Sequence, residues 1–208
     1  MRELDDFLPG IRPYAPGVAD PAAYFAIRQA AIEFCERTRM WQYTDEWTVN
    51  SDDCEGLLSP NGSVIHEIDK VWFNGQELRK VTPQKLDELL PHWRSTSEKP
   101  TGQPGYVTQT EPNTMVLVPY GAGTVRVSLY LKPSQTCDQL PDFLADQHRE
   151  TIAWGALARI LLIPNQSFTN PEMGAAFGQS FQAKLDGKSS AGITGQQRAP
   201  VRTRASFL

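Results

Sequence analysis

Residues 71–78 read Val-Trp-Phe-Asn-Gly-Gln-Glu-Leu, two strand-like runs joined by the pair Asn74-Gly75. Both residues of such a pair tolerate the positive φ that a two-residue turn between antiparallel strands requires. The octet therefore predicts a β-hairpin. This hairpin lies near the centre of a β-rich zone that we expect to cover residues 41–135.

Further strand patterns surround the hairpin. Residues 125–131 alternate apolar with polar or charged side chains, which predicts a strand with one buried face. Gly121-Ala122-Gly123 is interpreted as a hairpin turn between this strand and the one before it. The other predicted strands cover residues 41–49, 64–68 and 115–118. A short helix that starts at Thr82-Pro83 should interrupt the strands.

Helical periodicity occurs on both sides of the β zone. Asp20-Pro21 predicts a helix start, with the aspartate as cap and the proline in the first turn. Two later helices should begin at Pro141-Asp142 and at Asn170-Pro171. The segment from Leu8 to Gly17 contains several prolines and glycines, so we expect an extended or irregular lead-in rather than a helix.

The predicted fold class is α+β. A helical bundle, made of the first helix and two C-terminal helices, carries an inserted antiparallel β module and an extended C-terminal tail. The alternative is a single α+β sandwich. The predicted divisions are an N-terminal arm with the first helix (1–40), the β module (41–135), the C-terminal helices (136–186) and a basic tail (187–208).

Composition limits the class of protein. The chain has 208 residues, of which 40% are hydrophobic and 21% charged, and these values are typical of a globular domain. It contains no run of about 18 apolar residues, so we expect no membrane partner. The acidic N-terminus does not resemble a secretory signal. Three widely spaced cysteines indicate free thiols in a reducing compartment.

Chemical motifs are scarce. His66, His92 and His148 belong to no metal-binding or catalytic pattern. Gly187-Lys188-Ser189 lacks the first glycine of a phosphate-binding loop, because residue 182 is glutamine. The acidic stretch 45–55 lacks the spacing of a calcium loop. We therefore predict no catalytic residues, no metal and no cofactor.

The basic tail is the most informative feature of the sequence. Residues 187–208 carry a formal charge of +4, whereas the whole chain carries −4, so the first 186 residues carry −8. One interpretation is a disordered solubilising end. The other is a segment that becomes ordered on a partner. The candidate partner-binding residues are Lys188, Arg198, Arg202, Arg204, Phe207 and Leu208.

The β zone resembles the β module of bacteriophage head-to-tail adaptor proteins, including the tail tubular protein A type. The similar segments of the β zone are 68–78 (IDKVWFNGQEL), 102–107 (GQPGYV), 116–120 (VLVPY) and 130–133 (YLKP). The flanking helices are also similar, at 30–38 (AAIEFCERT), 154–161 (WGALARIL), 168–172 (FTNPE) and 177–181 (FGQSF). The resemblance covers residues 7–190, and its specificity lies in the order and spacing of these segments.

The resemblance implies a structural virion protein of the neck, made in the cytoplasm of the host bacterium. Such adaptors form a ring, a dodecamer, that joins the portal protein to a downstream tail or nozzle protein. Double-stranded DNA passes through that ring during ejection without specific binding. Two alternatives remain from the residues alone. One is a nucleic-acid-binding module that uses the basic tail, and the other is a small cytosolic hydrolase.

Overall fold

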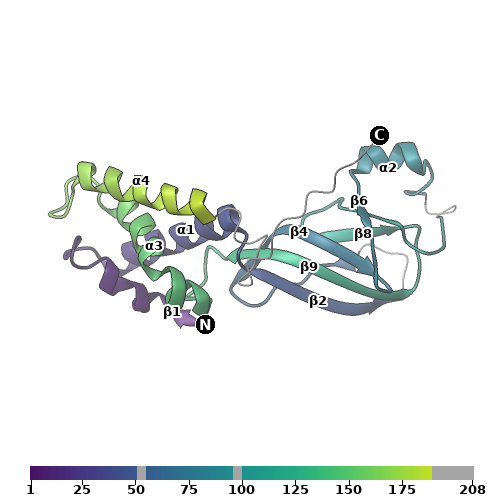
Figure 1. The fold of residues 1–208 in the computed structure, drawn as a ribbon, viewed down its shortest axis with the longest axis horizontal. Coiled ribbons are helices and arrows are strands. Elements are labelled where there is room, and N and C mark those ends of the chain that lie inside the picture. The colour runs from purple at the N-terminus through teal and green to yellow at the C-terminus, as the bar shows by residue number, and fades with distance from the viewer. Residues whose placement is uncertain (51–54, 96–99, 189–208) are drawn as a thin grey trace. The chain divides into compact units, whose positions relative to one another are not determined.

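The computed structural model describes residues 1–50, 55–95 and 100–188, and it divides the chain into two compact units (Figure 1). The helical unit comprises Met1–Trp41, Asn61–Val64 and Leu131–Leu208. The β unit comprises Gln42–Pro60 and Ile65–Tyr130, so it is inserted into the chain of the helical unit. The α+β fold class is confirmed.

The helical unit is built on three long helices with a short 3₁₀ helix and a two-residue sheet beside them. Helices α1 and α4 both pack on α3, as Figure 1 shows. The helices are η1 (Leu4–Gly10), α1 (Asp20–Thr38), α3 (Asp142–Ile160) and α4 (Pro171–Lys188). Strand β1 (Arg2–Glu3) pairs antiparallel with β10 (Gln139–Leu140).

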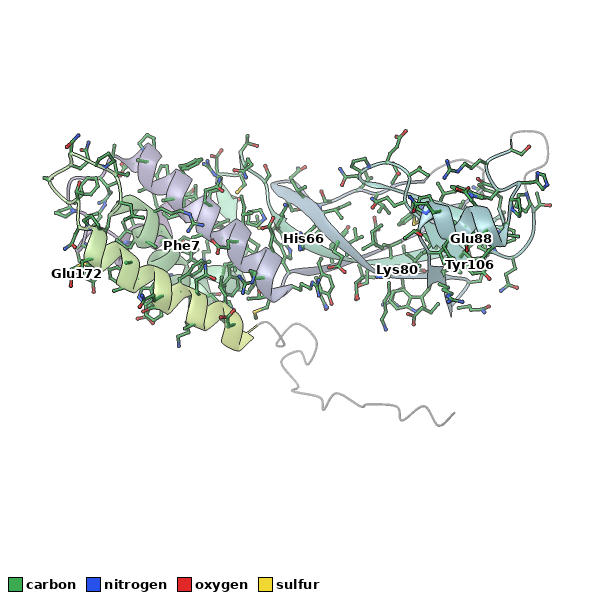
Figure 2. The ribbon with its side chains drawn as sticks, turned by 90° about the horizontal axis from the view of Figure 1, so that it is seen from above. Phe7, His66, Lys80, Glu88, Tyr106 and Glu172 are labelled. Atoms are coloured by element: carbon green, nitrogen blue, oxygen red, sulfur yellow. The ribbon has the colours of Figure 1, made fainter. Side chains whose placement is uncertain are left out.

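The start of the chain corrects one expectation. Leu8-Pro9-Gly10 lies in the 3₁₀ helix η1 rather than in an extended or irregular lead-in. Phe7 is fully buried in the core of the helical unit (Figure 2). A Cβ atom added at Gly10 would lie 2.9 Å from the Cβ of Ala153, so η1 approaches α3 closely. Apolar burial here outweighs the poor helix propensity of proline and glycine.

The helix starts follow the sequence with one difference. The side chain of Asn170 caps α4, because its Oδ1 accepts a hydrogen bond of 3.0 Å from the N–H of Met173. In α1 the capping position is Ala19, which makes no side-chain cap, and Asp20 is already the first helical residue. Asp20 therefore contributes as an acidic group in the first turn rather than as the predicted cap.

The β unit contains two four-stranded sheets and one short helix. In the first sheet the strand order is β2-β9-β4-β5, and in the second it is β3-β8-β7-β6. The first sheet consists of β2 (Gln42–Val49), β9 (Gly123–Pro133), β4 (Ser63–Phe73) and β5 (Gln76–Glu77). The second consists of β3 (Glu55–Gly56), β8 (Thr114–Val118), β7 (Tyr106–Thr108) and β6 (Arg79–Lys80).

The hairpin at Asn74-Gly75 is confirmed. Asn74 has a φ of 47° and Gly75 a φ of 82°, and Phe73 pairs with Gln76 across the turn. The strand at residues 125–131 is confirmed as part of β9, and Val125, Val127 and Leu129 are fully buried. The expected exposed face is wrong for its second half, because Ser128 and Tyr130 are buried as well and Arg126 alone of the alternating polar side chains is exposed. The hairpin and the strand are set locally, by turn chemistry and by period-two patterning.

The predicted hairpin at Gly121–Gly123 is wrong. The strands on either side, β8 and β9, belong to different sheets, so this segment carries the chain from one sheet to the other. A Cβ at Gly123 would lie only 2.5 Å from Cζ of Phe73, and one at Gly121 would lie 2.3 Å from the carbonyl oxygen of Gly102. The glycines are therefore required for close packing rather than for a hairpin turn.

Helix α2 (Pro83–Leu89) covers one face of the second sheet. The hydroxyl of Thr82 accepts a hydrogen bond of 3.3 Å from the N–H of Lys85, which confirms the predicted helix start. Leu86 is fully buried against Val118 and Trp93. This small cluster fixes α2 on the sheet by apolar burial.

Candidate partner-binding surfaces

The predicted binding segment begins at the end of α4. Lys188 is the last residue of that helix. Arg198, Arg202, Arg204, Phe207 and Leu208 lie outside the described residues. The structure therefore describes the helix from which the basic tail departs.

The C-terminal half of α4 is firmly held against its neighbours. Leu185 is fully buried, and Arg37 of α1 forms an ion pair of 2.6 Å with Asp186. One turn earlier, Gln182 donates a hydrogen bond of 2.7 Å to Glu33. Glu33 also pairs with Arg159 of α3 at 2.5 Å. These contacts join three helices at the point where the tail begins.

The histidines do not meet in a common site. His148 is buried in α3, where its ring lies 4.8 Å from the ring of Phe34. His66 lies on β4, and His92 is exposed after α2. Within residues 1–50, 55–95 and 100–188, no group of three or more His, Cys, Asp or Glu side chains is placed to hold a metal ion.

The acidic stretch 45–55 is only partly described. Asp45 and Glu46 lie on β2, where Oδ1 of Asp45 accepts a hydrogen bond of 2.9 Å from the N–H of Glu46. Asp52 and Asp53 lie outside the described residues. The Asp45 carboxylate therefore blocks one donor on the outer edge of the sheet.

Two thiols are inaccessible. Cys35 and Cys137 are both free and buried in the helical unit. Burial raises the pKa of each thiol above its ordinary value, because the thiolate loses its hydration. Neither thiol is suited to act as a nucleophile. Cys54 lies outside the described residues.

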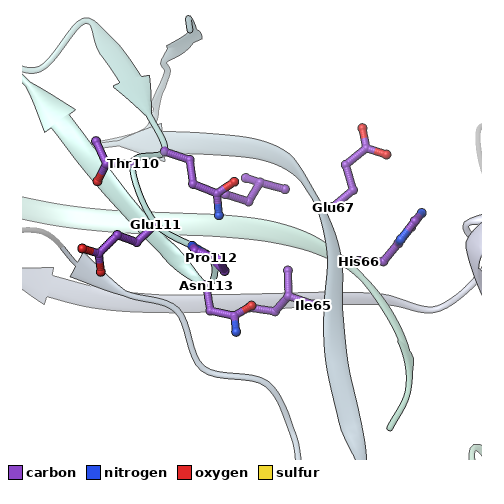
Figure 3. A pocket seen from close by; sticks show the side chains of 9 residues that line it. Ile65, His66, Glu67, Thr110, Glu111, Pro112 and Asn113 are labelled. Carbon is purple, nitrogen blue, oxygen red and sulfur yellow. The ribbon is translucent and has the colours of Figure 1, made fainter. Parts of the chain in front are cut away.

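A groove crosses the β unit between its two sheets. One wall is β4 at Ile65–Ile68, and the other is the segment 109–113 that joins β7 to β8 (Figure 3). This part encloses about 410 Å³. A second hollow of about 310 Å³ shares several of the same residues and continues to Lys80, Val81 and Thr108. The two hollows therefore form one continuous depression, which we call the β4 groove.

Two polar groups line the second hollow of the β4 groove. Lys80, labelled in Figure 2, donates hydrogen bonds to the carbonyl oxygens of Ile68 at 2.9 Å and of Asp69 at 2.7 Å. The side chain of Thr108 is buried, and its hydroxyl has no hydrogen-bond partner among the described residues. The sequence does not indicate this groove, because its walls are two segments that lie far apart in the chain and neither segment contains a recognisable binding motif.

The helical unit exposes several large apolar side chains. Phe25 of α1 is 57% exposed, and Leu162, just after α3, is 55% exposed. Tyr14 is also exposed, and its ring packs edge-on against Phe177 at 5.0 Å. No helix within the described ranges is long and apolar enough to cross a membrane.

Comparison with known proteins identifies the family. No curated protein matches the chain. The family model described as "SU10 adaptor protein" matches residues 3–204, which includes both units and most of the basic tail. The resemblance noted at the sequence level is therefore confirmed at the level of the head-to-tail adaptors, whereas the tail tubular protein A type is a finer assignment than this match supports. This chain belongs to the SU10 adaptor protein family, and it is a structural component of a bacteriophage virion rather than a member of a known enzyme family.

Proposed function

We propose that this adaptor forms a dodecameric ring that joins the portal to the next tail or nozzle protein. The genome passes through the ring during ejection. In this proposal the basic tail, with Lys188, Arg198, Arg202, Arg204, Phe207 and Leu208, docks on the portal. The protomer stays monomeric in solution, and the portal serves as template for the ring.

The observation that carries this proposal is the extent of the family match. It continues through the tail to residue 204, which favours a partner-binding segment over a solubilising end. The tail concentrates positive charge on a chain whose first 186 residues are acidic. Arginine suits such docking because its guanidinium pairs with carboxylates in a bidentate geometry.

Energetics explain why the ring would need a template. Ordering a tail residue costs about 1–2 kcal/mol. Burial of Phe207 or Leu208 returns roughly 2–3 kcal/mol each, and a desolvated arginine contact returns about 1–3 kcal/mol. One tail therefore binds weakly. Twelve tails on one symmetric platform bind tightly, because each docking raises the effective concentration of the next.

The exposed apolar side chains of the helical unit support ring contacts. Phe25 and Leu162 would be covered by a neighbouring copy or by the portal. Cyclic rings use heterologous interfaces, in which two different faces of one protomer meet. In this proposal the β unit remains available for the tail-side neighbour.

A truncation tests the docking role. A variant that ends at Lys188 retains every buried residue of the described cores, so it should fold as the full chain does. We expect it to lose binding to the purified portal of the same phage in co-sedimentation and electron microscopy. A triple Arg198→Lys, Arg202→Lys, Arg204→Lys variant should bind more weakly than wild type, and the matching Gln variant should not bind. Portal binding by the truncated variant at the wild-type level would contradict the proposal.

A further inference from the structure

We draw no further inference here: the strongest candidate, the β4 groove between the two sheets of the β unit with the buried Thr108 on its wall, carries no proposal, because nothing in the structure shows what covers it.

Discussion

At the residue scale, Tyr24 links the first long helix to the 3₁₀ helix. Its hydroxyl donates a hydrogen bond to the carboxylate of Asp5 in η1. This bond, together with desolvation, raises the pKa of Tyr24 to about 12. Because the folded-state pKa is raised above the unfolded value of 10.0, the folded protein keeps the proton longer. The stabilisation is complete below pH 10 and is lost as the pH rises through 12.

This linkage predicts the effect of Tyr24→Phe. The free energy of unfolding of the wild type, measured in urea, should fall more steeply between pH 9 and pH 12 than that of the variant. The comparison needs no further control variant, because all other titrating groups are common to the wild type and Tyr24→Phe. A difference spectrum of tyrosinate absorbance should show one tyrosine with a midpoint near 12. Parallel stability curves for the two proteins would contradict the assignment.

At the scale of elements, Gly155 sets the distance between three helices. A Cβ there would lie 2.8 Å from the Cβ of Ala30 in α1 and 2.9 Å from Cζ of Phe181 in α4. Gly155→Ala should therefore destabilise the protein by about 1–3 kcal/mol through overpacking. This outweighs the roughly 1 kcal/mol that alanine gains in helix propensity.

Gly178→Ala is the matched control for this packing argument. Its Cβ would lie 3.6 Å from the Cβ of Ala158, an ordinary van der Waals distance. We expect this variant to be neutral or more stable by about 0.5–1 kcal/mol. Thermal and urea unfolding of both variants measure the difference. A stable Gly155→Ala variant would show that the helices can separate at no cost.

At the scale of the whole molecule, charge is divided between body and tail. The first 186 residues carry −8 and the remaining 22 carry +4. In the proposed ring, bodies of this charge would repel packaged DNA, which could then slide without adhering. We expect the variant that ends at Lys188 to show no binding to double-stranded DNA in gel shifts at 50–150 mM salt. The full chain should bind weakly, with a salt slope no steeper than about −4.

The opposite result would favour a different function. Tight, salt-sensitive DNA binding by the truncated variant would contradict passive passage of the genome. Tight binding by the full chain alone would favour the nucleic-acid-binding alternative, in which the tail acts on DNA rather than on the portal. The salt series separates these two outcomes, because four charges produce only a shallow dependence.

The sequence alone determined the features whose physics is local. The hairpin at Asn74-Gly75, the strand at residues 125–131 and the helix cap at Asn170 each depend on neighbours within a few residues. The burial of Ser128 and Tyr130, on the face of that strand predicted to be exposed, was not indicated by the alternation. The order of such segments along the chain was enough to indicate the adaptor family. The α+β class followed from the same patterns.

Only the tertiary structure decided what depends on distant contacts. Residues 8–10, expected to be extended or irregular, form part of a 3₁₀ helix because Phe7 is buried in the core. At Gly123, where the chain crosses from one sheet to the other, the Phe73 ring leaves no space for a side chain. The β4 groove exists because residues 65–68 and 109–113 lie on facing walls. Local propensity carries no information about such tertiary contacts, since the free energy that drives them comes from burying surfaces that are far apart in the chain.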